Sequence, residues 1–270
     1  MRDLKYYIKS KEFIITTLIL FIFVIVNIFP DLRYGYFFLE FKDSFAFWQV
    51  ILTYGYGSYL QVILPLLVLF ASLKNVYFKF TGSYLKNVLL KEKYSSFLKN
   101  EIFKGYIQAY IPLFLVVSFV LILSFILYPS VLTPVSPTSE YLYLSGIITN
   151  PYVYIIFTYL CRFFFVASIV NIGILLIYYT KKLYVSILTG FIAFHLINFL
   201  FQYIMQTIGY YIGGSMLQQF FSNFSLMQGY VCAPNTVLSL IISAVFFFIT
   251  LTILYFVYKN KEKVVRNFEE

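Results

Sequence analysis

Long apolar runs alternate with short polar connections along the whole chain. Six of these runs are long enough to cross a hydrocarbon core of about 30 Å, which takes roughly 17 to 25 helical residues. Runs of this length favour helices, because a membrane-spanning β-strand would alternate polar and apolar residues over about half the length. We therefore predict an all-α polytopic membrane protein. It forms one transmembrane domain over residues 1–270, with spans at about 13–29, 48–73, 107–128, 152–179, 184–205 and 236–258.

The composition agrees with this class. The chain is 61% hydrophobic and 11% charged, whereas soluble proteins are about half apolar and about a quarter charged. The first span follows the basic leader MRDLKYYIKSK. No small-x-small cleavage site comes after that span, so we interpret it as a retained helix rather than a signal peptide.

Lysine and arginine gather in alternate connections. The leader holds four, residues 74–104 hold seven, the connection after the fourth span holds Lys181 and Lys182, and the tail holds four. Basic connections stay on the cytoplasmic side of a membrane, so we predict that both termini are cytoplasmic. The net charge of +9 then reflects topology and attraction to anionic lipid, and it predicts no nucleic-acid partner.

The largest block of lysines is SYLKNVLLKEKYSSFLKNEIFKGY, residues 83–106, between the second and third spans. Apolar residues recur there at helical spacing, in one set before the charged KEK and in a second set after it. The pattern predicts two short amphipathic helices. Such helices can lie in the cytoplasmic headgroup layer, or they can dock a soluble partner.

Few residues indicate catalysis. A single histidine, His195, excludes a multi-histidine metal site, and the chain has no CxxC, HExxH or GxxxxGK[ST] motif. Gly213, Gly214 and Ser215 faintly resemble a rhomboid-type serine motif, but the serine follows the histidine and falls in an outer loop, so we interpret them as a glycine-rich turn. We expect no enzyme activity, and any ATP must be bound by another polypeptide.

Polar residues inside the fifth span share one helix face. They follow the spacing i, i+3, i+7 and i+11 and are His195, Asn198, Gln202 and Gln206. Two interpretations remain open: hydrogen bonds between helices, or the lining of a substrate path.

Arg162 lies deep in the fourth span, and no Asp or Glu falls inside any predicted span. A guanidinium at that depth needs backbone carbonyls, water, the outer acids Glu40 or Asp43, or an anionic ligand. Its role is therefore either structural or substrate-binding. The outer segment 206–234 is too apolar for a solvated loop and too broken by glycine and polar residues to span, so we predict a re-entrant pair of short helices, with a lipid-surface helix as the alternative.

The run GSYLKNVLLKEKYSSFLKNEIFKGYI resembles the segment between the second and third spans of ABC-2 type permeases, the type V exporters of the ATP-binding cassette (ABC) transporters. In that family a glycine leads an apolar helix, a turn with serine follows, and a lysine opens the third span. Gly82, Leu89, Leu90, Ser96 and Lys104 match this order. The chain is also similar in length and in six spans with both ends inside, and the resemblance implies that its leader MRDLKYYIKSKEF forms an amphipathic helix.

The resemblance implies a half-transporter that works with a second permease chain, identical or related, and with two ABC ATPase subunits. ATP and Mg²⁺ would be bound by the ATPase, and this chain would bind no cofactor. Residues 84–96 would form the coupling helix. Its expected contacts with the ATPase are Tyr84, Lys86, Leu89, Leu90, Lys91, Glu92, Tyr94 and Ser96.

The implied substrate is amphipathic: a peptide, a lipid-linked molecule or a drug. The family further implies the plasma membrane of a Gram-positive bacterium, with antimicrobial peptide export or immunity as a possible task. A different class is also open, a non-enzymatic membrane scaffold or assembly factor whose basic loop binds lipid. A channel is less favoured, because the spans lack a repeated filter segment or ring-forming acids.

Overall fold

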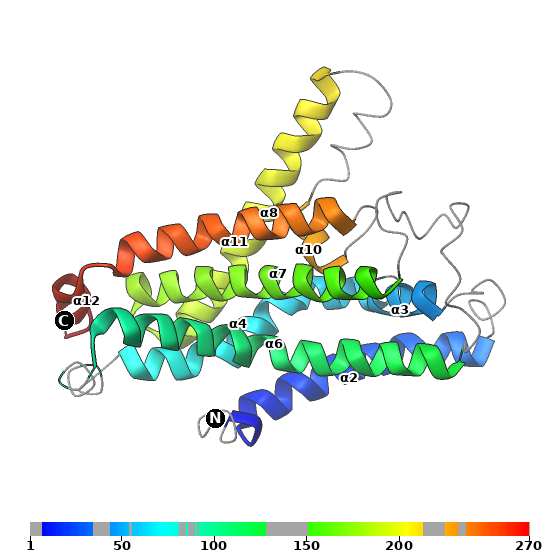
Figure 1. Cartoon of the computed structure of the whole chain (residues 1–270), viewed down its shortest axis with the longest axis horizontal. Coiled ribbons are helices and arrows are strands. Elements are labelled where there is room, and N and C mark those ends of the chain that lie inside the picture. Colours follow the sequence, from blue (N-terminus) through cyan, green and yellow to red (C-terminus); the bar gives the residue numbers. More distant parts are fainter. Residues whose placement is uncertain are drawn as a thin grey trace.

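The structure is a computed structural model that describes residues 7–34, 44–53, 56–80, 85, 90, 92–127, 151–212, 225–231 and 236–269. These residues form α-helices and include no β-strand. The helices, shown in Figure 1, are α2 (Lys11–Tyr34), α3 (Ser44–Thr53), α4 (Tyr56–Phe80), α6 (Tyr94–Leu127), α7 (Pro151–Thr180), α8 (Leu183–Ile212), α10 (Gln228–Val231), α11 (Thr236–Tyr258) and α12 (Lys261–Glu269).

In the described part of the chain, six helices are long and apolar enough to cross a membrane: α2, α4, α6, α7, α8 and α11. This confirms the predicted all-α class and the number of candidate spans. The second span differs from the prediction of one helix over 48–73, because Trp48 lies in the separate helix α3 and α4 begins only at Tyr56. Gly55 between the two helices and Gly57 in the first turn of α4 lower the helix propensity of the sequence there.

The helix α6 also differs from the prediction, which placed a short amphipathic helix before a span at 107–128. The structure joins the two in one helix of 34 residues, about 51 Å long at 1.5 Å per residue. Phe97, Leu98 and Ile102 are buried, as their helical spacing predicted. A hydrocarbon core of about 30 Å leaves the first turns of α6 outside it.

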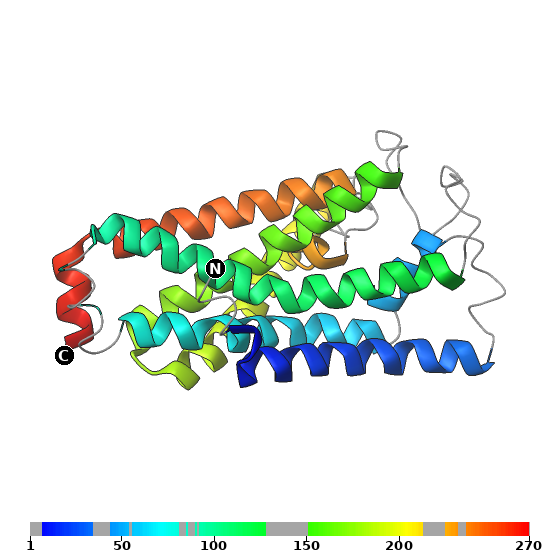
Figure 2. The same ribbon diagram turned by 60° about the horizontal axis from the view of Figure 1, so that its bottom comes forward.

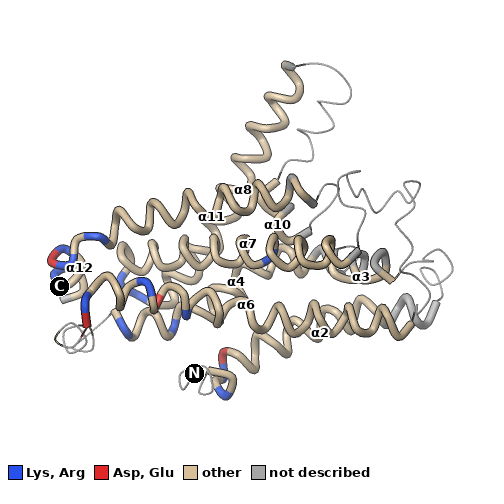
Figure 3. Tube along the Cα trace, in the orientation of Figure 1, with Lys and Arg blue, Asp and Glu red and all other residues tan. Residues whose placement is uncertain are grey.

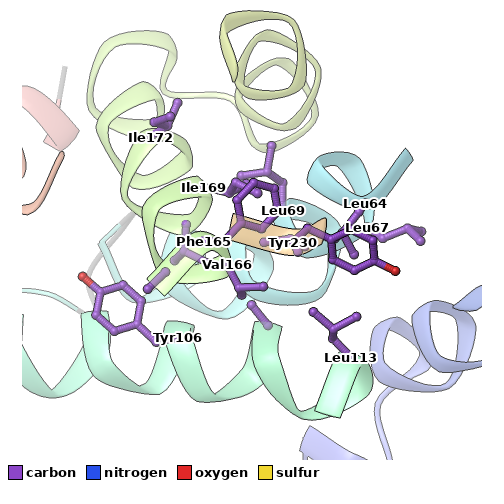
Figure 4. Close-up of a cluster of buried hydrophobic side chains, with 14 of the residues drawn as sticks. Leu64, Leu67, Leu69, Tyr106, Leu113, Phe165, Val166, Ile169, Ile172 and Tyr230 are labelled. Carbon is purple, nitrogen blue, oxygen red and sulfur yellow. The ribbon is translucent and has the colours of Figure 1, made fainter. Parts of the chain in front are cut away.

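The helix α7 lies at the centre of the bundle and packs against α4, α6, α8 and α11. Its residues Phe165, Val166 and Ile169 are fully buried. Figure 4 shows them facing Leu69 of α4 and Tyr230 of α10. A helix that is apolar on all sides is typical of such a central position.

One glycine sets the separation between α4 and α7. A Cβ atom added to Gly173 would lie 2.5 Å from Leu69 Cδ2 and 2.8 Å from Leu73 Cδ1. Both leucines are fully buried, so a shift of either side chain would disturb its neighbours in the core. The α4–α7 contact therefore favours a residue without a side chain at position 173.

The remaining helices form a layer around this centre. Figure 2 shows α2, α4 and α6 running along the long axis of the bundle, and α3 packs against α4 and α6. Near the start of α2, Tyr7 is buried and its hydroxyl donates a hydrogen bond to the Gln108 carbonyl oxygen at 2.5 Å. Burial raises the pKa of the Tyr7 hydroxyl above its ordinary value of 10.0. The predicted leader helix falls largely on residues 1–6, which lie outside the described residues.

The second half of α8 leaves the bundle, as Figure 1 shows. Its large apolar side chains there, including Phe199, Leu200, Tyr203 and Tyr211, are exposed. A helix with a broad apolar surface and few neighbours of its own is expected to face lipid or another protein.

Candidate functional site

Charged residues gather at one end of the bundle, which we name the charged end. It comprises the last turns of α4, the first turns of α6, the α7–α8 turn and α12, and Figure 3 shows the lysines and acids of these elements together. Hydrogen bonds join these elements to one another. Tyr94 donates a hydrogen bond to the Tyr258 carbonyl oxygen at 2.7 Å, and Asn267 Nδ2 donates one to the Tyr178 carbonyl oxygen at 2.7 Å.

Four of the predicted ATPase contacts belong to the described residues, and they point in different directions. Leu90 is 85% exposed, and Glu92 and Ser96 are also exposed. Tyr94 instead turns inward to its bond with α11. Tyr84, Lys86, Leu89 and Lys91 lie outside the described residues.

Glu101 is a residue that sequence analysis missed, because it precedes the predicted third span. Its side chain is only 7% exposed and lies 2.5 Å from Lys79 Nζ and 2.9 Å from Lys104 Nζ. One carboxylate thus joins α4 to α6 at the charged end. The signal in the sequence was the Glu-x-x-Lys spacing of Glu101 and Lys104, which puts both on one helix face.

Arg162 of α7 is fully buried. Its Nε donates a hydrogen bond to the Tyr230 carbonyl oxygen at 3.1 Å. Its Cζ lies 5.3 Å from the ring centroid of Trp48 and 5.3 Å from that of Tyr230. Of the partners considered for this guanidinium, the structure supplies a carbonyl, and it adds two aromatic faces that hold a cation by cation–π attraction.

The rings around Arg162 are themselves anchored. Trp48 Nε1 donates a hydrogen bond to the Val117 carbonyl oxygen at 3.0 Å, and the Tyr230 hydroxyl donates one to the Leu52 carbonyl oxygen at 3.0 Å. A Cβ atom on Gly229 would lie 2.4 Å from Ser243 Oγ, so α10 sits tightly on α11. Arg162 therefore joins α3, α7 and α10 in an enclosed position, which favours its structural role.

The polar face of α8 divides into two halves. His195 Nε2 lies at hydrogen-bond distance, 3.0 Å, from the Val62 carbonyl oxygen. Asn198 Oδ1 accepts bonds from Ser225 Oγ and from the Leu226 amide, each at 3.0 Å. These two residues bind the chain's own bundle.

Gln202 and Gln206 lie further along, on the half of α8 that leaves the bundle. Gln202 is partly exposed and Gln206 is exposed. The residues that precede them in the sequence, Phe201 and Met205, line an apolar crevice of about 410 Å³ together with Leu226 and α11. The short helix α10, within the predicted re-entrant segment, packs against α3, α7 and α11, whereas residues 213–224 lie outside the described residues.

A buried polar cluster at the centre of the bundle also escaped sequence analysis. The Tyr106 hydroxyl donates a hydrogen bond to Asn171 Oδ1 at 2.5 Å, and Asn171 Nδ2 donates one to Thr250 Oγ1 at 3.1 Å. The cluster joins α6, α7 and α11. Asn171 was visible as a polar residue inside an apolar run, but its partners lie far away in the chain.

Among the described residues, no group of three His, Cys, Asp or Glu side chains lies close enough to hold a metal ion. The features that stand out are the exposed side chain of Leu90 at the charged end, the enclosed Arg162, and the second half of α8, which leaves the bundle.

In the comparisons with known proteins, no family model matches the chain, and no curated protein and no solved structure is significantly similar to it.

Proposed function

We propose that this chain is the transmembrane permease subunit of an ABC exporter, driven by a separate ATPase subunit that binds ATP and Mg²⁺. The observation that supports this best is Leu90, 85% exposed at the charged end. In the sequence it is flanked by Lys86, Lys91 and Lys93. An exposed apolar side chain among charges suits a protein contact, in which the apolar group gives affinity and the charges fix the register.

The position of Leu90 also suits the transmission of force. Leu85 and Phe97 are buried on either side of it in the chain, so the segment is attached to the bundle at both ends. The helix α6 begins only four residues after Leu90. By the positive-inside rule the charged end faces the cytoplasm, where an ATPase would act.

The second half of α8 supports a partnership with a second permease chain. In lipid an exposed amide is costly unless it finds a hydrogen-bond partner, and the side chains of Gln202 and Gln206 make no hydrogen bond to the described residues. The apolar crevice lined by Phe201 and Met205 of the same helix suits the apolar part of an amphipathic substrate such as a peptide, a lipid-linked molecule or a drug.

The test is a purification of the tagged chain from its own plasma membrane in mild detergent, with identification of the proteins that accompany it. The variant Leu90→Glu changes the exposed side chain, and Lys261→Glu on α12 is the matched control, since it adds a carboxylate to the same charged end. We expect an ATPase with a GxxxxGK[ST] motif to accompany the wild type and the control. Loss of a central apolar contact costs about 2 kcal/mol, so Leu90→Glu should retain roughly thirtyfold less of it.

If no ATPase accompanies the wild-type chain, the exporter proposal is wrong and the membrane scaffold takes its place. If both variants lose the ATPase equally, general charge at this end holds it and Leu90 is not the contact. Gel filtration of each variant shows whether the chain itself has stayed folded.

A further inference from the structure

A groove opens at the charged end between the end of α4 and the start of α8, with a volume of about 420 Å³. Lys74, Tyr77 and Phe78 line it from α4, and Lys182 and Tyr184 line it from the α7–α8 turn and the first turn of α8. We name it the lysine groove. It is separate from Leu90 and from Arg162.

The α7–α8 turn gives the groove a fixed shape. Lys181 has a φ of 53°, in the left-handed region, and its carbonyl oxygen accepts a hydrogen bond from the Tyr77 hydroxyl at 3.1 Å. The hydroxyls of Thr180 and Ser186 lie 2.6 Å apart, and Ser186 donates to the Lys182 carbonyl oxygen at 2.8 Å. The backbone of Lys182 is thereby held next to α4.

The groove has an excess of positive charge. Lys74 Nζ lies 2.5 Å from Glu12 of α2, yet 44% of the Lys74 side chain stays exposed. Lys182 lines the groove from the turn and is exposed, so two lysines stand against one described carboxylate. The nearby Lys79 points to Glu101 instead. A site with this balance attracts an anion, and lysine ammonium groups bind phosphate oxygens by charge-assisted hydrogen bonds.

An apolar track continues from the groove along α8. Tyr184, Leu188 and Ile192 follow i, i+4 and i+8, so they share one helix face, and they are 74%, 57% and 54% exposed. The track runs from the charged end toward the apolar middle of the bundle. A ligand that fits both parts has an anionic head and a hydrocarbon tail.

We propose that the lysine groove binds the phosphate headgroup of an anionic phospholipid, whose acyl chain lies along Tyr184, Leu188 and Ile192. The inference needs only a membrane around the bundle and holds whether or not an ATPase binds Leu90. Because a free anion would leave the apolar track without a ligand, we assign the groove to a lipid rather than to soluble phosphate.

The test uses the full chain in phosphatidylcholine nanodiscs that contain a minor fraction of phosphatidylglycerol. After gentle release into detergent, native mass spectrometry counts the phosphatidylglycerol that stays bound. The variant is Lys182→Glu, since the Lys182 side chain is exposed and makes no hydrogen bond or ion pair to the described residues. Lys261→Glu on α12 is the control for the same change of charge elsewhere at the charged end.

We expect the wild type to retain phosphatidylglycerol in preference to phosphatidylcholine. Each surface lysine strengthens such attraction by a factor of about five, so a reversal of charge at Lys182 should weaken retention by roughly thirtyfold. Lys261→Glu and Lys182→Arg should retain it. An equal loss in Lys261→Glu, or no preference for phosphatidylglycerol in the wild type, would overturn the proposal.

Two further experiments distinguish a lipid headgroup from free phosphate, and the lysine groove from the apolar track. Millimolar inorganic phosphate should not displace the lipid; full displacement would mean a site for a free anion. Leu188→Ser should weaken retention of long-chain phosphatidylglycerol but not of its short-chain, soluble analogue. Equal effects on both lipids would show that the track along α8 plays no part.

Discussion

The substitution Gly173→Ala tests how closely α4 and α7 pack. The added methyl group would meet Leu69 at 2.5 Å and Leu73 at 2.8 Å, and overpacking of a tight core costs about 1–3 kcal/mol. Alanine regains roughly 0.5–1 kcal/mol over glycine in a helix. We therefore expect a net loss of up to about 2.5 kcal/mol in the free energy of unfolding, measured by circular dichroism during unfolding in dodecyl sulfate micelles.

Gly105→Ala is the matched control, because it is the same chemical change in the same bundle. A Cβ atom at position 105 would lie 3.4 Å from Val170 Cγ1 and 3.5 Å from Val76 Cγ2, close to ordinary contact. This variant should be neutral or more stable than the wild type, by up to about 1 kcal/mol.

The double variant Gly173→Ala with Leu69→Ala isolates the contact itself. Leu69→Ala removes the atom nearest to the new methyl group, so Gly173→Ala should cost at least about 0.5 kcal/mol less in that background. If Gly173→Ala is as harmless as Gly105→Ala, or if Leu69→Ala does not lessen its cost, the two helices do not touch as described.

Three shorter predictions concern the other buried polar groups. Arg162→Ala should lower the free energy of unfolding by about 2–4 kcal/mol, because it removes two desolvated cation–π contacts and a charge-assisted hydrogen bond. It should also expose Trp48, the one tryptophan, to quenching by acrylamide. Unchanged quenching of the tryptophan fluorescence would contradict this prediction. Glu101→Gln should lower the free energy of unfolding by about 1–2 kcal/mol. This is less than the loss of a fully buried ion pair would cost, because the partner Lys79 is partly exposed. An unaltered unfolding midpoint would refute this prediction. Tyr7→Phe should cost about 1 kcal/mol. Because burial raises the pKa of Tyr7, a released Tyr7 ionises at lower pH than the buried one, so the stability that the wild type has over Tyr7→Phe should shrink as the pH of the unfolding experiment rises above 10.0.

The sequence was most informative about the long helices. In lipid every backbone group must bond within its own segment, so a long apolar run almost dictates a helix, and six such helices are present among the described residues. The start of the second span was not predictable in this way. Apolar content stays high on both sides of Gly55 and Gly57, so hydropathy alone does not separate α3 from α4.

The site residues were predictable as unusual positions but not as contacts. The depth of Arg162 and the shared face of His195 and Asn198 follow from periodicity. Their partners come from remote segments: Trp48 and Tyr230 for Arg162, and Ser225 and Leu226 for Asn198. Long-range pairs of this kind depend on how the helices pack, which a single sequence does not encode locally.

The unbroken helix α6 has the proportions of a lever with unequal arms. At Gly105, which lacks a side chain, α6 packs against Val170 of α7 and Val76 of α4, and we take this contact as a fulcrum. Eleven residues separate Gly105 from Tyr94 at the charged end and twenty-two separate it from Leu127, which makes arms of about 17 Å and 33 Å. A tilt about this fulcrum would move the far end twice as far as the near end. Pro112, which lacks a backbone N–H, lies in the longer arm and makes it the more pliable of the two.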